Sequence, residues 1–218
     1  YKMRTMEAAM DNQVVPAPLS DYYLYPLPGT YDVHKNESHQ LNLMSAERVP
    51  VTKSYYLETP AAMYQQPQPM TNHFDIRYSF VNVERDQLGT PLPSGKVRVL
   101  LVDKGGIPRF LGEDTLPHTP AGESVQLTVG KAFDLVTDRT QTTFRASDRA
   151  METGYEIVVR NRKKEKVTLV LHEKFAGNWT IISQTESGKR IDSTTQEYVL
   201  QLDAGATRTF SYLVRLTF

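Results

Sequence analysis

The chain has 218 residues with 25 acidic and 25 basic side chains, 39% hydrophobic residues and no cysteine. This length suits one large β domain or two ordinary domains, and the balanced charge argues against nucleic-acid or anionic-membrane binding, both of which need a basic patch. The lack of cysteine excludes disulfides, thiolate zinc sites and cysteine nucleophiles. No apolar run approaches the roughly 20 residues that cross a bilayer.

The first part of the chain predicts contact with a partner. Residues 1–20 show no strand alternation, and we expect an N-terminal tether or a partner-held segment. The aromatic stretch DYYLYPLP follows, and its Tyr22, Tyr23 and Tyr25 are candidate partner-binding residues. We expect residues 1–28 to contact a second copy or the upstream part of the same protein. Because the sequence starts at Tyr1 without a visible signal peptide, we expect a piece of a longer protein.

The rest of the first half predicts short strands separated by turns. The clearest strand is HFDIRYSFVNVE, in which Phe74, Ile76, Tyr78 and Phe80 alternate with polar residues. The sequence DKGG after VRVLLV predicts a tight turn, because glycine accepts positive φ without steric cost. Expected strands in this half lie at 31–33, 38–44, 48–58, 73–84, 97–102, after 108, and 125–129.

The second half predicts a separate module. Residues 136–152 are polar without apolar periodicity, and we expect a linker there. Alternating rows then begin at Tyr155, Val167, Trp179, Tyr198 and Phe210, and the single tryptophan is a candidate core anchor. Short strands at regular spacing favour antiparallel sandwiches. We therefore predict an all-β chain with two tandem immunoglobulin- or fibronectin-like sandwiches, at residues 21–135 and 153–218.

Several segments together resemble one bacterial family. They are YPLPGTYDV, LMSAERVPVTKSYYLE, TGYEIVVRN and, most specifically, PLPSGKVRV followed by FLGED and HTPAGE. This pattern, from Tyr22 to the end, resembles the family named domain of unknown function 4139, and is similar to the C-terminal part of mucoidy-inhibitor-A-like proteins. The resemblance implies a β-sandwich region of a larger, exported protein at the periplasm or cell surface. It supplies no catalytic residues and no cofactor.

One loop contains residues that can bind a metal or transfer protons. Glu113, Asp114, His118 and Glu123 lie within a dozen residues, and two carboxylates with an imidazole suit a divalent cation or acid–base work. Such a site requires the side chains to converge on one point. The structural alternative is a loop in which threonines satisfy the turn and His118 caps it. No HExxH, GxSxG, P-loop or GxGxxG motif occurs.

Three functional hypotheses follow. The first is a non-catalytic structural or interaction module of a bacterial envelope or surface protein, since the sequence contains no recognised catalytic motif and no cofactor is expected. The second is a carbohydrate- or ligand-binding module of an exported hydrolase, in which Tyr55, Tyr56 and Tyr64 stack on sugar; this requires all three to be exposed on one face. The third is a metal-dependent enzyme at the GEDTLPHTPAGE loop.

Overall fold

The computed structural model describes residues 16–218 except 28 and 33, and these residues form an all-β structure. The described part contains one short 3-10 helix, η1 (Glu84–Asp86), and no α-helix. Within this part, no helix has the length and apolar character needed to cross a membrane. The strands are β1 (Ala17–Leu19), β2 (Tyr22–Leu24), β3 (Thr52–Pro60), β4 (Met70–Val81), β5 (Gly95–Val102), β6 (Pro108–Leu116), β7 (Ser124–Ala146), β8 (Ala150–Asn161), β9 (Val167–Lys174), β10 (Asn178–Gln184), β11 (Lys189–Arg190), β12 (Thr195–Leu202) and β13 (Thr207–Thr217).

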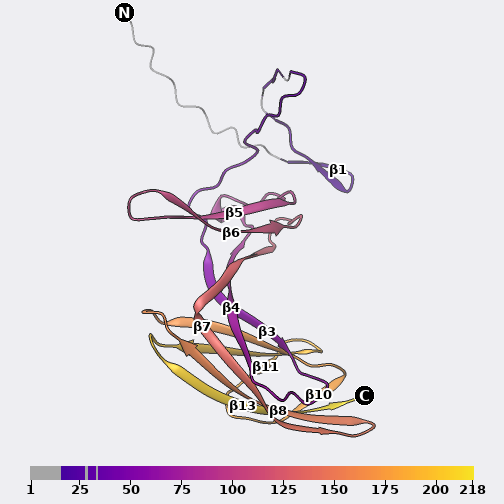
Figure 1. The fold of residues 1–218 in the computed structure, drawn as a ribbon. Helices are drawn as coiled ribbons and strands as arrows, with labels where there is room; N and C mark the ends of the chain where they lie inside the picture. Colours follow the sequence, from indigo (N-terminus) through magenta and orange to yellow (C-terminus); the bar gives the residue numbers. More distant parts are fainter. Residues whose placement is uncertain (1–15, 28, 33) are drawn as a thin grey trace, which may run out of the picture. The chain divides into compact units, whose positions relative to one another are not determined.

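Nine of these strands form one mixed sheet, in the order β10-β13-β8-β7-β4-β3-β9-β12-β11 (Figure 1). β8 pairs antiparallel with both β7 and β13, whereas β3 runs parallel to β9. β1 with β2 and β5 with β6 form two further two-stranded sheets. The large sheet therefore joins strands from both halves of the chain.

The large sheet curls around a single core. Tyr198 on β12 and Phe210 on β13 belong to the eighth and second strands of the order, yet their ring centroids lie 5.1 Å apart. Trp179 on β10 donates its indole N–H to the Ser193 carbonyl oxygen at 2.7 Å, beside the opposite edge. The inward rows supply the core, and burying one such large apolar side chain stabilises the fold by about 1.5–3 kcal/mol. Fully buried members include Phe74, Leu135, Tyr155, Val159, Leu169, Tyr198, Leu200, Val214 and Leu216.

The contacts divide the described residues into two compact units, those up to 51 with 80–96 and 115–125 in one, and 52–79, 97–114 and 126–218 in the other. Asn82, fully buried, organises the first unit. Its Nδ2 donates to the carbonyl oxygens of Thr90 at 2.7 Å and Pro120 at 2.9 Å, and its Oδ1 accepts from the Gly89 N–H at 2.9 Å. Gly89 has φ +84, and an added Cβ would lie 2.6 Å from the backbone nitrogen of Glu84. Glycine is therefore required there.

The structure differs from the expected linker at residues 136–152. These residues form the second half of β7, the start of β8 and the tight turn between them, where the Ser147 N–H donates to the Ala150 oxygen at 2.8 Å. Apolar periodicity missed this strand because its inward positions carry Thr137 and Arg139, which are buried but polar. The expected boundaries at 135 and 153 consequently fall inside the paired strands β7 and β8.

Other expected elements show mixed outcomes. The strands predicted around Phe74, Val97, Val125, Tyr155, Val167, Trp179, Tyr198 and Phe210 are present. The described residues of 31–33 and all of 38–44 form no strand, and Val33 lies outside the described residues, as do residues 1–15 of the expected tether. The DKGG turn is formed as predicted: Gly106 has φ +80, and Asp103 Oδ1 accepts the N–H groups of Gly105 at 2.9 Å and Ile107 at 3.0 Å.

Candidate functional site

Three neighbouring strands place polar side chains together on the outer face of the large sheet. β3, β9 and β12 each alternate core residues with outward residues, because successive side chains of a strand point to opposite faces. Tyr56 and Glu58 point outward from β3, His172 from β9 and Glu197 from β12. Parallel pairing aligns Glu58 with His172, and antiparallel pairing aligns Glu197 with His172. The sheet register thus brings together residues that are distant in sequence.

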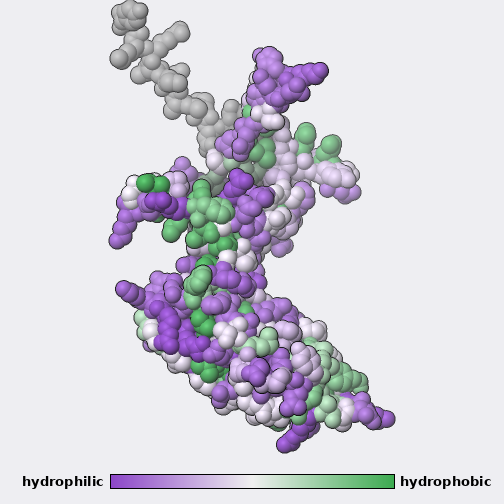
Figure 2. All heavy atoms as spheres, viewed as in Figure 1, coloured by the Kyte–Doolittle hydropathy of each residue, from purple (hydrophilic) through white to green (hydrophobic). Residues whose placement is uncertain are grey.

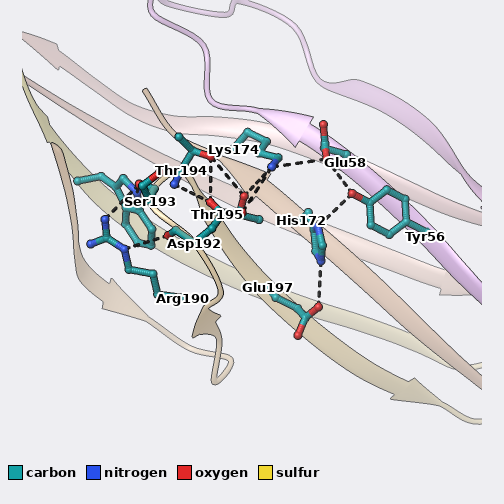
Figure 3. Close-up of polar contacts among 11 residues, drawn as sticks. Tyr56, Glu58, His172, Lys174, Arg190, Asp192, Ser193, Thr194, Thr195 and Glu197 are labelled. Atoms are coloured by element: carbon teal, nitrogen blue, oxygen red, sulfur yellow. Dashed lines mark hydrogen bonds and ion pairs between the residues drawn. The ribbon is translucent and has the colours of Figure 1, made fainter. Parts of the chain in front are cut away.

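These four side chains form a continuous hydrogen-bonded row (Figure 3). The Tyr56 hydroxyl donates to Glu58 Oε2 at 2.7 Å and lies 3.0 Å from His172 Nδ1. His172 Nε2 lies 2.9 Å from Glu197 Oε2. Three hydrogen bonds need three protons, and the phenol supplies only one. Because the phenol proton goes to Glu58, the imidazole nitrogens and the Glu197 carboxyl group share the other two protons.

Tyr56 acts in this row as a neutral donor. Burial raises its pKa to about 12, the hydrogen bond and charge of Glu58 add to the rise, and Arg77 opposes it. A phenol with so high a pKa is a poor nucleophile and a poor general base at neutral pH. Tyr56 therefore suits the role of a hydrogen-bond donor better than that of a nucleophile or a base.

The raised pKa of Tyr56 predicts alkaline sensitivity. Its hydroxyl is held protonated in the folded chain, so its contribution to stability is complete below the ordinary pKa of 10.0 and is lost as pH rises toward about 12. We expect the free energy of unfolding to fall across this window, and the Tyr56→Phe variant to show a smaller fall. Urea unfolding at several pH values measures this, with Tyr64→Phe as the exposed control. An equal fall in the two variants would contradict the assignment.

A polar hollow of about 250 Å³ lies beside the row. Arg77 on β4 contributes the cation of this hollow, and its Cζ lies 3.2 Å from the ring centroid of Tyr56. Its Nε is buried without a hydrogen-bond partner in the described part of the chain. All its lining residues except Val170 have a polar group in the side chain, and they are Ser54, Tyr56, Arg77, Ser79, Gln126, Val170, His172 and Glu197.

The turn before β12 lies beside Lys174, at one end of this row of polar side chains (Figure 3). Lys174 Nζ donates to Thr195 Oγ1 at 2.6 Å and lies 3.9 Å from Glu58 Oε2 and 4.0 Å from Asp192 Oδ2. The Thr194 N–H donates to Asp192 at 2.7 Å. Hydrogen bonds from the backbone of Thr194 and from Thr195 lower the pKa of Asp192 to about 2. This carboxylate is therefore ionised throughout the physiological pH range.

A second charged cluster lies inside the core. Arg139 on β7 and Glu173 on β9 are 3% and 0% exposed, and Arg139 Nη2 lies 2.8 Å from Glu173 Oε2. The Tyr212 hydroxyl and Thr59 Oγ1 donate to Glu173 at 2.7 and 2.8 Å. Burial lowers the pKa of Arg139, but the attraction of Glu173, Tyr212 and Tyr155 outweighs it and leaves this pKa above its ordinary value. The cluster is fully paired and serves the fold.

The candidate metal residues have separate partners. Glu113 Oε2 lies 3.4 Å from Arg98 Nε, and Asp114 Oδ2 accepts the Thr128 N–H at 2.6 Å. His118 contacts Ser94, with Nε2 3.1 Å from Oγ. Among the described residues no group of three or more His, Asp or Glu side chains is arranged to hold a metal ion. The metal hypothesis therefore receives no geometric support.

The candidate aromatic residues divide into exposed and buried ones. Tyr22 and Tyr23 are exposed on the β1–β2 hairpin, while the Tyr25 hydroxyl donates to the Pro91 oxygen at 2.9 Å. Tyr64 is also exposed, but Tyr55 and Tyr56 are 5% and 8% exposed. Three tyrosines exposed on one face were the condition for the sugar-stacking hypothesis. That platform is not formed, because β3 turns Tyr55 into the core and Arg77 covers Tyr56.

An exposed apolar surface lies on the β5–β6 hairpin (Figure 2). Next to the turn, five large apolar residues are more than half exposed, namely Leu100, Leu101, Val102, Ile107 and Phe110. Neighbouring residues of a strand point to opposite faces, so exposure of consecutive residues means that both faces are uncovered. A two-stranded sheet of this kind is marginal in water by itself. Large exposed apolar surfaces mark interaction sites.

Sequence reasoning missed the hollow because its residues come from five strands. In the sequence, His172 belongs to no motif, and Arg77 alternates with apolar residues as any outward residue of a strand does. The signal that existed was the alternation VTLVLHEK, which predicts His172 on the outer face of β9. Comparison with known proteins adds nothing to these assignments: no family model, no curated protein and no solved structure matches the chain.

Proposed function

We propose that the chain is a non-catalytic structural and interaction module of a larger bacterial envelope or surface protein. The observation that carries this proposal is the β5–β6 hairpin, whose apolar side chains next to the turn are exposed on both faces. The bacterial origin, the export to the periplasm or cell surface and the contact with an upstream part of the same protein rest on the family resemblance. The neutral, hydrogen-bonded Tyr56 and the fully paired Arg139–Glu173 cluster support a role without catalysis.

The partner proposed for the hairpin is a second copy of the chain. β5 has one edge without a strand partner among the described residues, and its sequence GKVRVLLV is rich in β-branched and apolar residues. An antiparallel β5–β5 pair centred on Val99 places Arg98 opposite Leu100 and Lys96 opposite Val102. No two like charges then face each other. Two hairpins joined in this way make a four-stranded sheet, which is stable where two strands are marginal.

For the architecture we propose one β-sandwich rather than two tandem immunoglobulin-like ones. The contact between Tyr198 and Phe210 supports two facing layers that belong to the same curled sheet. Strands β3, β4 and β7 lie in the middle of that sheet. Such an arrangement presents its turns and the β5–β6 hairpin as the free surfaces for contact.

A charge on the hairpin should prevent self-association. We expect the native chain to be a dimer by light scattering and the Leu100→Asp/Leu101→Asp variant to be a monomer, because buried carboxylates at a strand pair are unsatisfied. Both side chains are exposed in the single chain, so the variant should keep the circular-dichroism spectrum of the folded β structure. Val199→Asp, at an exposed apolar position on β12, is the matched control and should remain dimeric. A monomeric native chain, or a dimeric variant, would refute the proposed partner.

A further inference from the structure

We propose that the hollow lined by Ser54, Arg77 and Ser79 is a binding site for an oxyanion, either a carboxylate or a phosphate group. The proposal concerns the outer face of the large sheet and is independent of the interaction role of the β5–β6 hairpin. It rests on the geometry of one guanidinium and two hydroxyl groups, on the absence of a carboxylate partner for that guanidinium, and on the size of the hollow.

The register of β3 and β4 brings the three side chains together. Ser54 lies directly opposite Arg77 in this antiparallel pair, and Ser79 follows Arg77 by two residues, on the same face of the strand. All three line the same hollow. The site therefore offers a planar group with several N–H donors and two hydroxyl donors on one side. Guanidinium groups bind carboxylate and phosphate oxygens through paired hydrogen bonds.

The charge of Arg77 is unmatched in the described structure. Arg139, by contrast, is paired with Glu173, and Arg160 and Arg215 have carboxylate partners at 2.6 Å. No described carboxylate forms an ion pair with Arg77, and its Nε is buried without a hydrogen-bond partner. Its Cζ lies 3.2 Å from the centroid of the Tyr56 ring, and this cation–π contact holds the group beside the hollow. A partly buried cation without a counter-charge is costly, and an incoming anion removes that cost.

The neighbouring carboxylates are already occupied. Glu197 is hydrogen-bonded to His172, and Glu58 accepts from Tyr56 and lies 3.9 Å from Lys174 Nζ. Each negative charge near the hollow therefore has its own partner, which leaves Arg77 for the ligand. The volume of about 250 Å³ is below the range of pockets for drug-sized molecules, roughly 300–1,000 Å³. The hollow fits a small anion or the charged end group of a larger molecule.

Titration of the full chain with inorganic phosphate and with acetate, at neutral pH and constant ionic strength in chloride, tests the proposal. We expect saturable shifts in the backbone amide NMR signals of residues 54, 77 and 79. The Arg77→Gln variant should weaken binding by about tenfold or more, because a charge-assisted hydrogen bond is lost. Ser54→Ala/Ser79→Ala should weaken it by a smaller factor, and Arg77→Lys should retain part of it.

The control and the outcomes of this titration distinguish binding in the hollow from binding elsewhere on the chain. Arg162→Gln, which removes an exposed arginine outside the hollow, is the matched control and should bind as the native chain does. Binding of acetate alone identifies a carboxylate ligand, and binding of phosphate alone a phosphate ligand. If Arg77→Gln proves unfolded by its amide spectrum, the serine double variant and Arg77→Lys provide the test. Absence of saturable shifts in the native chain would overturn the proposal. So would variants of Arg77 or of the two serines that bind with the same affinity as the native chain.

Discussion

Replacing Glu173 by glutamine is expected to lower the free energy of unfolding by about 3–5 kcal/mol, as for other buried ion pairs that lose one partner. The carboxylate is fully buried and accepts from Arg139, Tyr212 and Thr59. Glutamine keeps the size of the side chain but removes its charge. The Arg139 guanidinium would then remain buried without a counter-charge, in contact with the Tyr212 hydroxyl at 2.9 Å and with the Tyr155 ring centroid at 3.3 Å from its Cζ.

Urea unfolding of the two chains measures this difference. Glu152→Gln is the matched control, because Glu152 Oε1 also lies 2.6 Å from an arginine, Arg215, whose side chain is 53% exposed. Exposed pairs contribute less than about 1 kcal/mol. A quadruple variant, Arg139→Met/Glu173→Leu/Tyr212→Phe/Thr59→Val, removes the charges and both hydroxyl groups that donate to Glu173, and should recover most of the loss. A decrease in the free energy of unfolding below about 1 kcal/mol for Glu173→Gln would contradict the buried ion pair between Arg139 and Glu173.

The same cluster explains why part of the fold escaped prediction. β4, β5, β8, β9, β12 and β13 carry alternating apolar rows, which predict strands directly. The second half of β7 instead carries Thr137 and Arg139 toward the core, and its stability depends on Glu173, which is 34 residues further along the chain. A local hydropathy pattern contains no information about such a partner. Residues 136–152 were therefore predicted as a linker, because their sequence lacks the apolar alternation of a strand.

Pairing between distant strands escaped prediction for a related reason. Turn chemistry identified the β5–β6 hairpin, since DKGG determines a local connection. The parallel contact of β3 with β9 joins residues more than 100 positions apart, such as Tyr55 and Leu169. No local signal specifies that neighbour. The hollow around Arg77 and His172 depends on this pairing, so its component residues were visible in the sequence and their assembly was not.

The position of β3 and β4 in the large sheet predicts a long-range effect of Phe74. Its side chain is fully buried in the same core cluster as Tyr198 and Phe210, although it belongs to the first half of the chain. Phe74→Ala should cost about 3–5 kcal/mol, since it leaves a cavity in a packed core. Trp179 is the single tryptophan and lies on β10, so its fluorescence follows the second half of the chain. We expect Phe74→Ala to shift this fluorescence transition to lower urea concentration.

Two independent modules, at 21–135 and 153–218, would give the opposite result, because the Trp179 transition would then be insensitive to position 74. Phe133→Ala is the control: this side chain is 88% exposed and should change stability by less than about 0.5 kcal/mol. The fragment 153–218 extends the test. It lacks β3, β4 and β7, so β8 and β9 each lose a strand neighbour. We expect this fragment to show no cooperative unfolding, because the sheet and its core are completed only by strands from the first half.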